Sequence, residues 1–244
     1  MNYSSNPPMM ADPDFPAPQG ALPVWIKVFT KPGEQTFIEI TSHPEAKARA
    51  AYIWVFIAGT LSGLINSLTQ FVVSYIGLRQ AGPEFGQMPG SSTAFGIGGL
   101  LFAVCFAPLT GLFSVVGFSF GVAIVHATAK FFGGQGLFDK MAYAVGAITV
   151  PITLISALTV PLNSIPFVAF CTLPVFVVLG LYGLYLEVAA IKAVHRLGWG
   201  ESAAALFLPS ILLVLVLGVI ILGLARMAGP ELNDIFRQLQ QGAP

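Results

Sequence analysis

Five long apolar runs constrain this chain more than any other feature. A helix needs about 20 predominantly apolar residues to cross roughly 30 Å of hydrocarbon. Charged residues are 9% of the chain, against about 25% in soluble domains, and hydrophobic residues are 55%. The sequence therefore predicts an all-α fold, a polytopic helical membrane protein built as a five-span bundle. We place the spans at about residues 50–76, 108–130, 141–161, 167–191 and 204–225.

The apolar stretch at residues 95–106 leaves the number of spans open. It follows a loop-like segment at residues 82–93, and joined to the span at 108–130 it would make a helix of about 37 residues, roughly 55 Å long. Because Pro108 lacks a backbone donor, we expect that helix to break or kink there. Residues 95–106 are then an interfacial or re-entrant piece, and a sixth span is the alternative.

Two segments of different character precede the first span. Residues 1–22 are polar and rich in proline, with too few apolar residues to offset the entropy of ordering, and predict a disordered tail. This tail has no basic start and no apolar core, so we expect the first span to direct insertion. Residues 23–43 mix aromatic and aliphatic residues with lysine and glutamate, which predicts an amphipathic segment in the headgroup region. An ordinary solvated linker is the alternative. The capping-box spacing from Ser42 to Glu45 predicts that the next helix begins there.

Lysine and arginine are divided unequally between the two sides of the predicted bundle. With a cytoplasmic N-terminus, the inner segments hold eight of them and the outer segments hold three. Because basic residues favour the cytoplasmic side, we predict a cytoplasmic N-terminus and an outer C-terminus. The eight are Lys27, Lys31, Lys47, Arg49, Lys130, Lys140, Lys192 and Arg196, and the three are Arg79, Arg226 and Arg237.

Small residues recur four positions apart in two of the predicted spans. Gly59 and Gly63 share one helical face of the first span, and Gly117 and Gly121 share one face of the second. Such faces let another helix approach closely in lipid. They predict a compact bundle or an oligomer.

Few polar side chains are expected at membrane depth. Glu187 and His126 lie in spans that both run from the outer to the inner side, so we expect them at similar depth. Because charge in hydrocarbon is costly, an ionisable residue in a span is a functional hypothesis. The alternative is that Glu187 reaches the interface or pairs locally and only fixes helix packing. Asn66 and Gln70 lie one turn apart, and we expect them to join helices by amide hydrogen bonds.

No catalytic or phosphate-binding motif is present in the sequence. The formal net charge is zero, which does not suit a nucleic-acid partner. The three histidines, His43, His126 and His195, have no metal-ligand spacing, and Cys105 and Cys171 both lie in apolar runs. We expect no enzyme activity, no cofactor and no metal.

A glycine turn between the second and third spans carries a recognisable pattern. Its glycines, Gly133, Gly134 and Gly136, give the backbone unusual freedom. They follow Ala-Lys-Phe-Phe and precede Tyr143, a run of small residues and Pro151. This order resembles the Yip domain family, the Ypt- or Rab-interacting multispanning membrane proteins and their prokaryotic relatives.

The resemblance extends over about residues 29–224. It identifies residues 44–228 as a Yip-like transmembrane domain, followed by a polar C-terminal tail at 229–244. It implies a membrane adaptor or scaffold whose partners are the bilayer and other membrane proteins or further copies of itself, with a small GTPase as a partner of distant members. The acidic Asp-Leu-x-Gly-Pro motif of eukaryotic members is absent before the first span. The resemblance therefore implies a prokaryotic-type member in a prokaryotic cell membrane. A small transporter or channel using Glu187 and His126 is the alternative.

Overall fold

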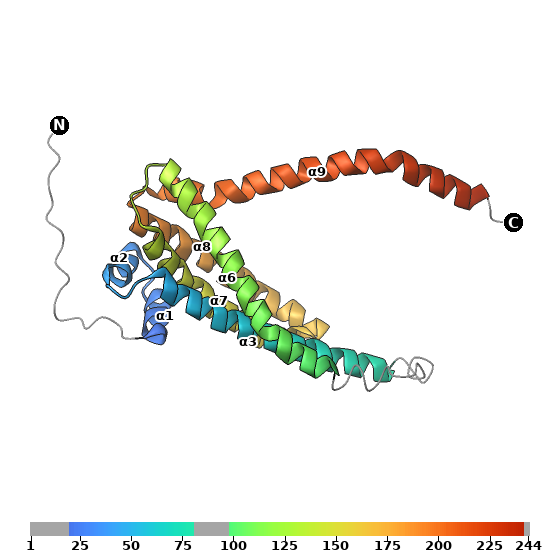
Figure 1. Cartoon of the computed structure of the whole chain (residues 1–244), viewed down its shortest axis with the longest axis horizontal. Coiled ribbons are helices and arrows are strands. Elements are labelled where there is room, and N and C mark those ends of the chain that lie inside the picture. Colours follow the sequence, from blue (N-terminus) through green and yellow to red (C-terminus); the bar gives the residue numbers. More distant parts are fainter. Residues whose placement is uncertain (1–19, 81–97, 242–244) are drawn as a thin grey trace.

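The computed structural model describes residues 20–80 and 98–241, and these residues form seven helices and no strand (Figure 1). Five of the helices are long and apolar enough to cross a membrane, which confirms the predicted all-α, five-span architecture. Nearly all of the predicted tail at 1–22 and the whole loop at 82–93 lie outside the described residues. The helices are α1 (Ala21–Thr30), α2 (Glu34–Ser42), α3 (Ala48–Gln80), α6 (Gly99–Phe131), α7 (Phe138–Asn163), α8 (Pro166–His195) and α9 (Trp199–Gln241).

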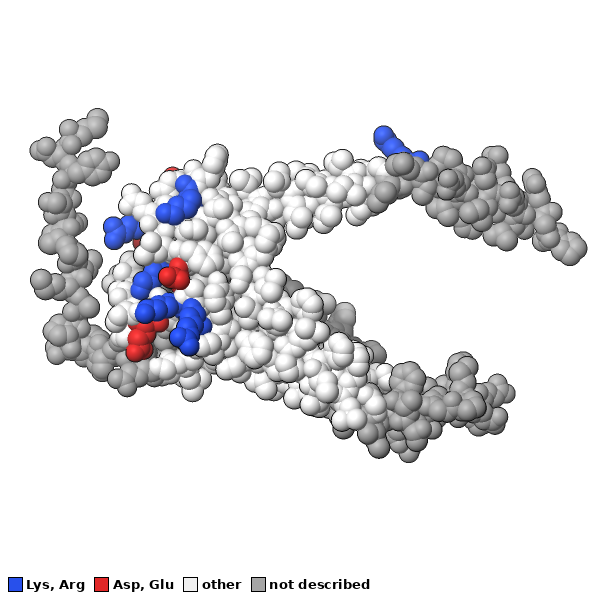
Figure 2. All heavy atoms as spheres, viewed as in Figure 1, with Lys and Arg blue, Asp and Glu red and all other residues white. Residues whose placement is uncertain are grey.

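Successive long helices alternate in direction, so their ends meet at two opposite sides of the bundle. The start of α3, the end of α6, the start of α7, the end of α8 and the start of α9 share one side. Figure 2 shows that the charged residues gather there, whereas the long helices are almost uncharged. We call this side the charged end. It contains all eight basic residues that the sequence assigned to the inner side: Lys27, Lys31, Lys47, Arg49, Lys130, Lys140, Lys192 and Arg196.

The amphipathic segment at 23–43 folds onto the charged end as α1 and α2. The helix α1 packs against α7, and α2 packs against both α7 and α8. Four apolar side chains from these two helices are fully buried in a core shared with α7 and α8: Val24, Val28, Phe37 and Ile40. This segment is therefore a folded part of the bundle, and the solvated-linker alternative is wrong.

Polar contacts hold α1 and α2 in place. Lys27 pairs with Glu39 between the two short helices, and Lys192 of α8 pairs with Glu34 at the start of α2. The hydroxyl group of Tyr182 donates a hydrogen bond to the backbone oxygen of Phe29 (2.9 Å). Phe29 lies in the last turn of α1.

The start of α3 differs from the predicted one. Ser42 does not cap α3; it is the last residue of α2, and its hydroxyl donates to the backbone oxygen of Glu39 (2.7 Å). His43 precedes a proline, which disfavours helical geometry, and adopts an extended conformation with ψ of 139°. The α2 helix therefore stops at Ser42, and α3 begins at Ala48.

The predicted break at Pro108 is wrong. The helix α6 continues through Pro108 from Gly99 to Phe131, so residues 99–106 are its first turns and form no separate re-entrant piece. Proline is tolerated in membrane helices where neighbouring helices support the backbone. Here α3 packs against α6 directly after Pro108, at Thr110 and Ser114. The described part contains no sixth span.

The last helix, α9, leaves the bundle soon after it begins. Its first turn is fixed by the Glu201 carboxylate, which accepts a hydrogen bond from the Gly198 backbone N–H (3.0 Å), as in a capping box. Ala205 is buried and Leu206 is half-buried against α6 and α8, but every large apolar side chain from Ile211 to Leu222 is exposed. Figure 1 shows α9 diverging from the other long helices.

Candidate functional site

The glycine turn at the charged end closes α6 with a Schellman motif. Gly133 has a φ of 89°, the left-handed region that favours glycine. Its N–H donates to the backbone oxygen of Lys130 (2.9 Å), and the N–H of Gly134 donates to that of Ala129 (2.9 Å). These two bonds satisfy carbonyl groups that a helix end leaves free. The structure thus explains why the turn after α6 requires Gly133.

The other turn glycines are needed because the turn packs directly on the end of α8. A Cβ atom at Gly134 would lie 2.7 Å from Nδ1 of His195, and a Cβ atom at Gly136 would lie 2.6 Å from the Val194 backbone oxygen. The N–H of Gln135 donates to the His195 backbone oxygen (3.2 Å). Any side chain at Gly134 or Gly136 would separate the turn from α8.

His195 also contacts His126, the candidate residue from the sequence analysis. Nδ1 of His126 lies 3.3 Å from Nε2 of His195, within hydrogen-bond distance, and the His126 and Phe138 rings pack perpendicular to each other. His195 is 1% exposed, and its Nδ1 has no hydrogen-bond partner in the described part of the chain. The described contacts of His126 are therefore with His195 and Phe138 rather than with Glu187. Sequence spacing gave no signal for this pair, because 69 residues separate its members.

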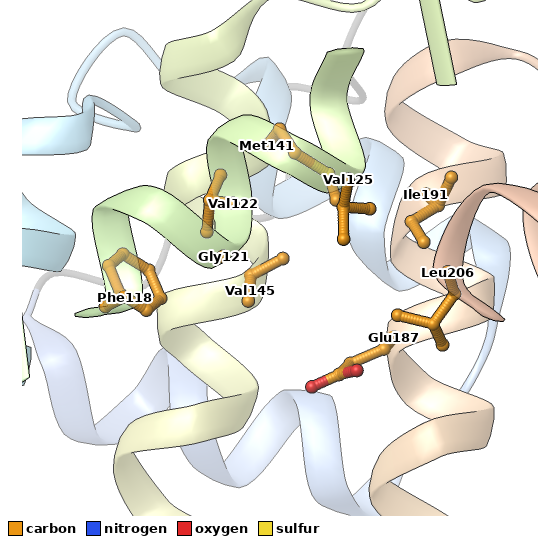
Figure 3. Close-up of a pocket in the computed structure, with 9 residues that line it drawn as sticks. All are labelled: Phe118, Gly121, Val122, Val125, Met141, Val145, Glu187, Ile191 and Leu206. Carbon is orange, nitrogen blue, oxygen red and sulfur yellow. The ribbon is translucent and has the colours of Figure 1, made fainter. Parts of the chain in front are cut away.

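Glu187 lies in a cavity of about 200 Å³ between α6, α7, α8 and α9. Its carboxyl group extends from α8 into the space that eight apolar residues enclose (Figure 3). Glu187 and His195 lie two helical turns apart on α8, roughly 12 Å along the axis at 1.5 Å per residue. Glu187 therefore lies deeper in the bundle than His195. The apolar lining consists of Phe118, Gly121, Val122, Val125, Met141, Val145, Ile191 and Leu206.

The two glycine faces have different surroundings. A Cβ atom at Gly59 would lie 2.5 Å from Oγ of Ser114, and one at Gly63 would lie 2.8 Å from Cβ of Thr110. This face of α3 is therefore in close contact with α6. Cβ atoms at Gly117 and Gly121 would meet nothing within 4 Å. Gly121 borders the Glu187 cavity, and this second face contacts no helix within the described chain.

A family model for the Yip1 domain matches residues 26–222, which is most of the chain. The chain belongs to the Yip1 domain family. It matches no curated protein and no solved structure. The matched region begins within α1 and ends where the fifth apolar span ends, so the Yip1 domain includes both short helices as well as the five spans.

The remaining family-like residues of the Yip1 domain are structural parts of α7. Tyr143 is 7% exposed, and its ring lies 5.0 Å from that of Trp54, measured between centroids. Pro151 lies inside α7, which continues through it to Asn163. Tyr143 thus belongs to the buried core, and Pro151 does not end the helix.

The amide pair of the Yip1 domain has a local role in the structure. The side chains of Asn66 and Gln70 are both exposed on α3, and the Asn66 amide group donates to the Ser62 backbone oxygen of its own helix (3.1 Å). The expected hydrogen bond from Asn66 to another helix is thus replaced by one within α3.

Within residues 20–80 and 98–241, the Yip1 domain contains no group of three or more His, Cys, Asp or Glu side chains arranged to hold a metal ion. Two titratable features inside its spans are the His126–His195 pair and the Glu187 carboxyl group. The first is enclosed by the glycine turn, and the second faces an apolar cavity.

Proposed function

We propose that this Yip1 domain protein is a non-enzymatic membrane adaptor, which holds other membrane proteins or further copies of itself through its helix faces. The observation that carries the proposal is the exposure of the apolar side chains of α9. Over the apolar length from Ile211 to Leu222 its large side chains are all exposed, although the helix begins as a packed part of the bundle. A span of this kind leaves a face on which another helix can dock.

The charged end supplies a second surface for partners. We propose that it faces the cytoplasm, because it collects eight of the basic residues and basic residues favour that side. The C-terminus of α9 then lies on the opposite side of the membrane. The ion pairs at Lys27 and Lys192 fix α1 and α2 there, so a soluble or peripheral partner, such as the small GTPase implied by the family resemblance, would meet a folded surface.

The interior of the bundle supports an adaptor better than a transporter. A pathway for solute needs polar groups along its length. The cavity at Glu187 has one carboxyl group and an otherwise apolar lining, and the histidine pair lies behind the packed glycine turn. These groups do not form a polar path within the described residues.

Photo-crosslinking along α9 tests the adaptor role. Benzoylphenylalanine is placed at single positions from Ile211 to Leu222, and the protein is irradiated in its own membrane. We expect a protein adduct of one constant mass at positions that recur every three to four residues, because a docked helix touches one face. Positions on the opposite face of α9 are the matched controls. An absence of protein adducts at all positions, or equal adducts around the whole helix, would contradict the proposal.

A further inference from the structure

We propose that the cavity between α6, α7, α8 and α9 binds a membrane-dissolved amphiphile with a protonated amino group, and that Glu187 is the ion-pair partner of that amine. This inference goes beyond the adaptor role and does not depend on it. It rests on the volume of the cavity, on the absence of a positive partner for Glu187 in its lining, and on the free space beside Gly121.

The cavity has the volume and the lining for an aliphatic chain. Eight of its nine lining residues are apolar or glycine, and their side chains contain no hydrogen-bond donor. Leu206 is the lining residue from α9, and it lies just before the point where that helix leaves the bundle. The next large side chains, Phe207 and Leu208, are exposed. The apolar lining of the cavity is therefore adjacent to the exposed apolar surface of α9.

The cavity also contains an uncompensated acid. In the described part of the chain Glu187 forms no ion pair, and Lys192, the nearest basic residue in the sequence, pairs with Glu34 and lies over the Trp199 ring. A carboxylate in apolar surroundings is costly unless a cation or several donors meet it. The lining provides neither, so Glu187 either stays protonated or, when ionised, takes its complement from a ligand. An ammonium group supplies both a positive charge and three donors.

Two glycines on α6 provide a matched test of the cavity. A side chain at Gly121 or at Gly117 would meet nothing within 4 Å, so the backbone accepts one at either position. Gly121 lines the cavity, whereas Gly117, one turn earlier, does not. A leucine at Gly121 would fill the cavity, and a leucine at Gly117 would leave it unchanged.

The experiment uses purified full-length protein in phosphatidylcholine liposomes and a dodecylamine probe with a diazirine group in its chain. After irradiation, the labelled peptides are identified by mass spectrometry, with unlabelled dodecylamine and dodecanol as competitors. We expect saturable labelling of peptides that contain the lining residues. Dodecylamine should compete at a concentration at least about tenfold lower than dodecanol, since the alcohol cannot form the ion pair.

Substitutions separate the contribution of the Glu187 charge to binding from that of the cavity volume. We expect Glu187→Gln to remove the preference for the amine, Gly121→Leu to remove the labelling and Gly117→Leu to leave both unchanged. Equal competition by the amine and the alcohol, or site labelling that survives both Glu187→Gln and Gly121→Leu, would overturn the proposal. If Gly121→Leu lowers the unfolding temperature so far that the protein is not folded, the Glu187→Gln result decides alone.

The lipid composition identifies the source of the amine. Phosphatidylethanolamine carries the same ammonium group in its headgroup. If adding it to the liposomes raises the dodecylamine concentration needed for labelling, the site takes that headgroup. If it has no effect, the site takes a free aliphatic amine. Both results keep Glu187 as the ion-pair partner, and neither depends on whether α9 binds protein partners.

Discussion

His126 and His195 form a contact that can be measured through its energy. Their nitrogens lie 3.3 Å apart, and residues in direct contact couple by about 0.5–3 kcal/mol in double-mutant cycles. We therefore expect His126→Ala and His195→Ala to be non-additive in the free energy of unfolding in detergent. A second cycle, with Glu187→Ala in place of His195→Ala, is the matched comparison and should show weaker coupling. Stronger coupling to Glu187 would mean that the wrong pair has been assigned.

The two glycine faces predict different effects of a Gly-to-Ala substitution on the free energy of unfolding. Gly59→Ala puts a methyl group 2.5 Å from Oγ of Ser114, and such overpacking costs about 1–3 kcal/mol. Gly117→Ala meets nothing within 4 Å, and alanine is a better helix former than glycine by roughly 0.5–1 kcal/mol. We expect the first to lower and the second to preserve or raise the free energy of unfolding. Equal effects from both would refute the close contact between α3 and α6.

Sequence spacing predicts which residues share a helix face, but it does not identify the neighbour. Both glycine pairs have the same spacing of four, yet only Gly59 and Gly63 meet another helix in the described chain. Sequence spacing does not identify His195 as the partner of His126 for the same reason. Its partners come from the end of α6 and the glycine turn, and no local pattern near His195 indicates them.

At the scale of elements, α1 and α2 should contribute strongly to stability although they do not span the membrane. Phe37 is fully buried against α7 and α8, and Phe-to-Ala changes in cores cost about 3–5 kcal/mol. Its neighbour Ile38 is 42% exposed, so Ile38→Ala is the control. We expect only Phe37→Ala to lower the unfolding temperature markedly. A small effect of Phe37→Ala would show that α2 is not part of the cooperative unit.

The number and place of the spans were predictable because hydrocarbon thickness sets helix length. The exact ends of the helices were not predictable, because tertiary contacts decide where a helix begins and ends. Pro108 suggests a break, but α6 continues through it and packs against α3 just beyond it. Ser42 suggests the cap of the next helix, although it is the last residue of α2. The Glu187 cavity requires four helices to meet, which no single stretch of sequence indicates.

At the scale of the whole molecule, the five spans predict opposite sides for the glycine turn and the end of α9. Single cysteines at Gln135, which is exposed in the turn, and at Gln240 are introduced after Cys105 and Cys171 are replaced. A membrane-impermeant maleimide should label Gln135→Cys only from the cytoplasmic face and Gln240→Cys only from the outer face. Labelling of both from one face would contradict the five-span arrangement.

The central claim is that this Yip1 domain protein works through its helix surfaces and does not move solute. Proton entry into liposomes is the most direct test, because Glu187 and the His126–His195 pair are the groups inside the spans best able to carry protons. A pH-sensitive dye inside the liposomes reports entry after an acid jump. We predict equal rates for wild-type protein, Glu187→Gln and protein-free liposomes. Faster proton entry with the wild-type protein that is lost in Glu187→Gln would contradict the claim.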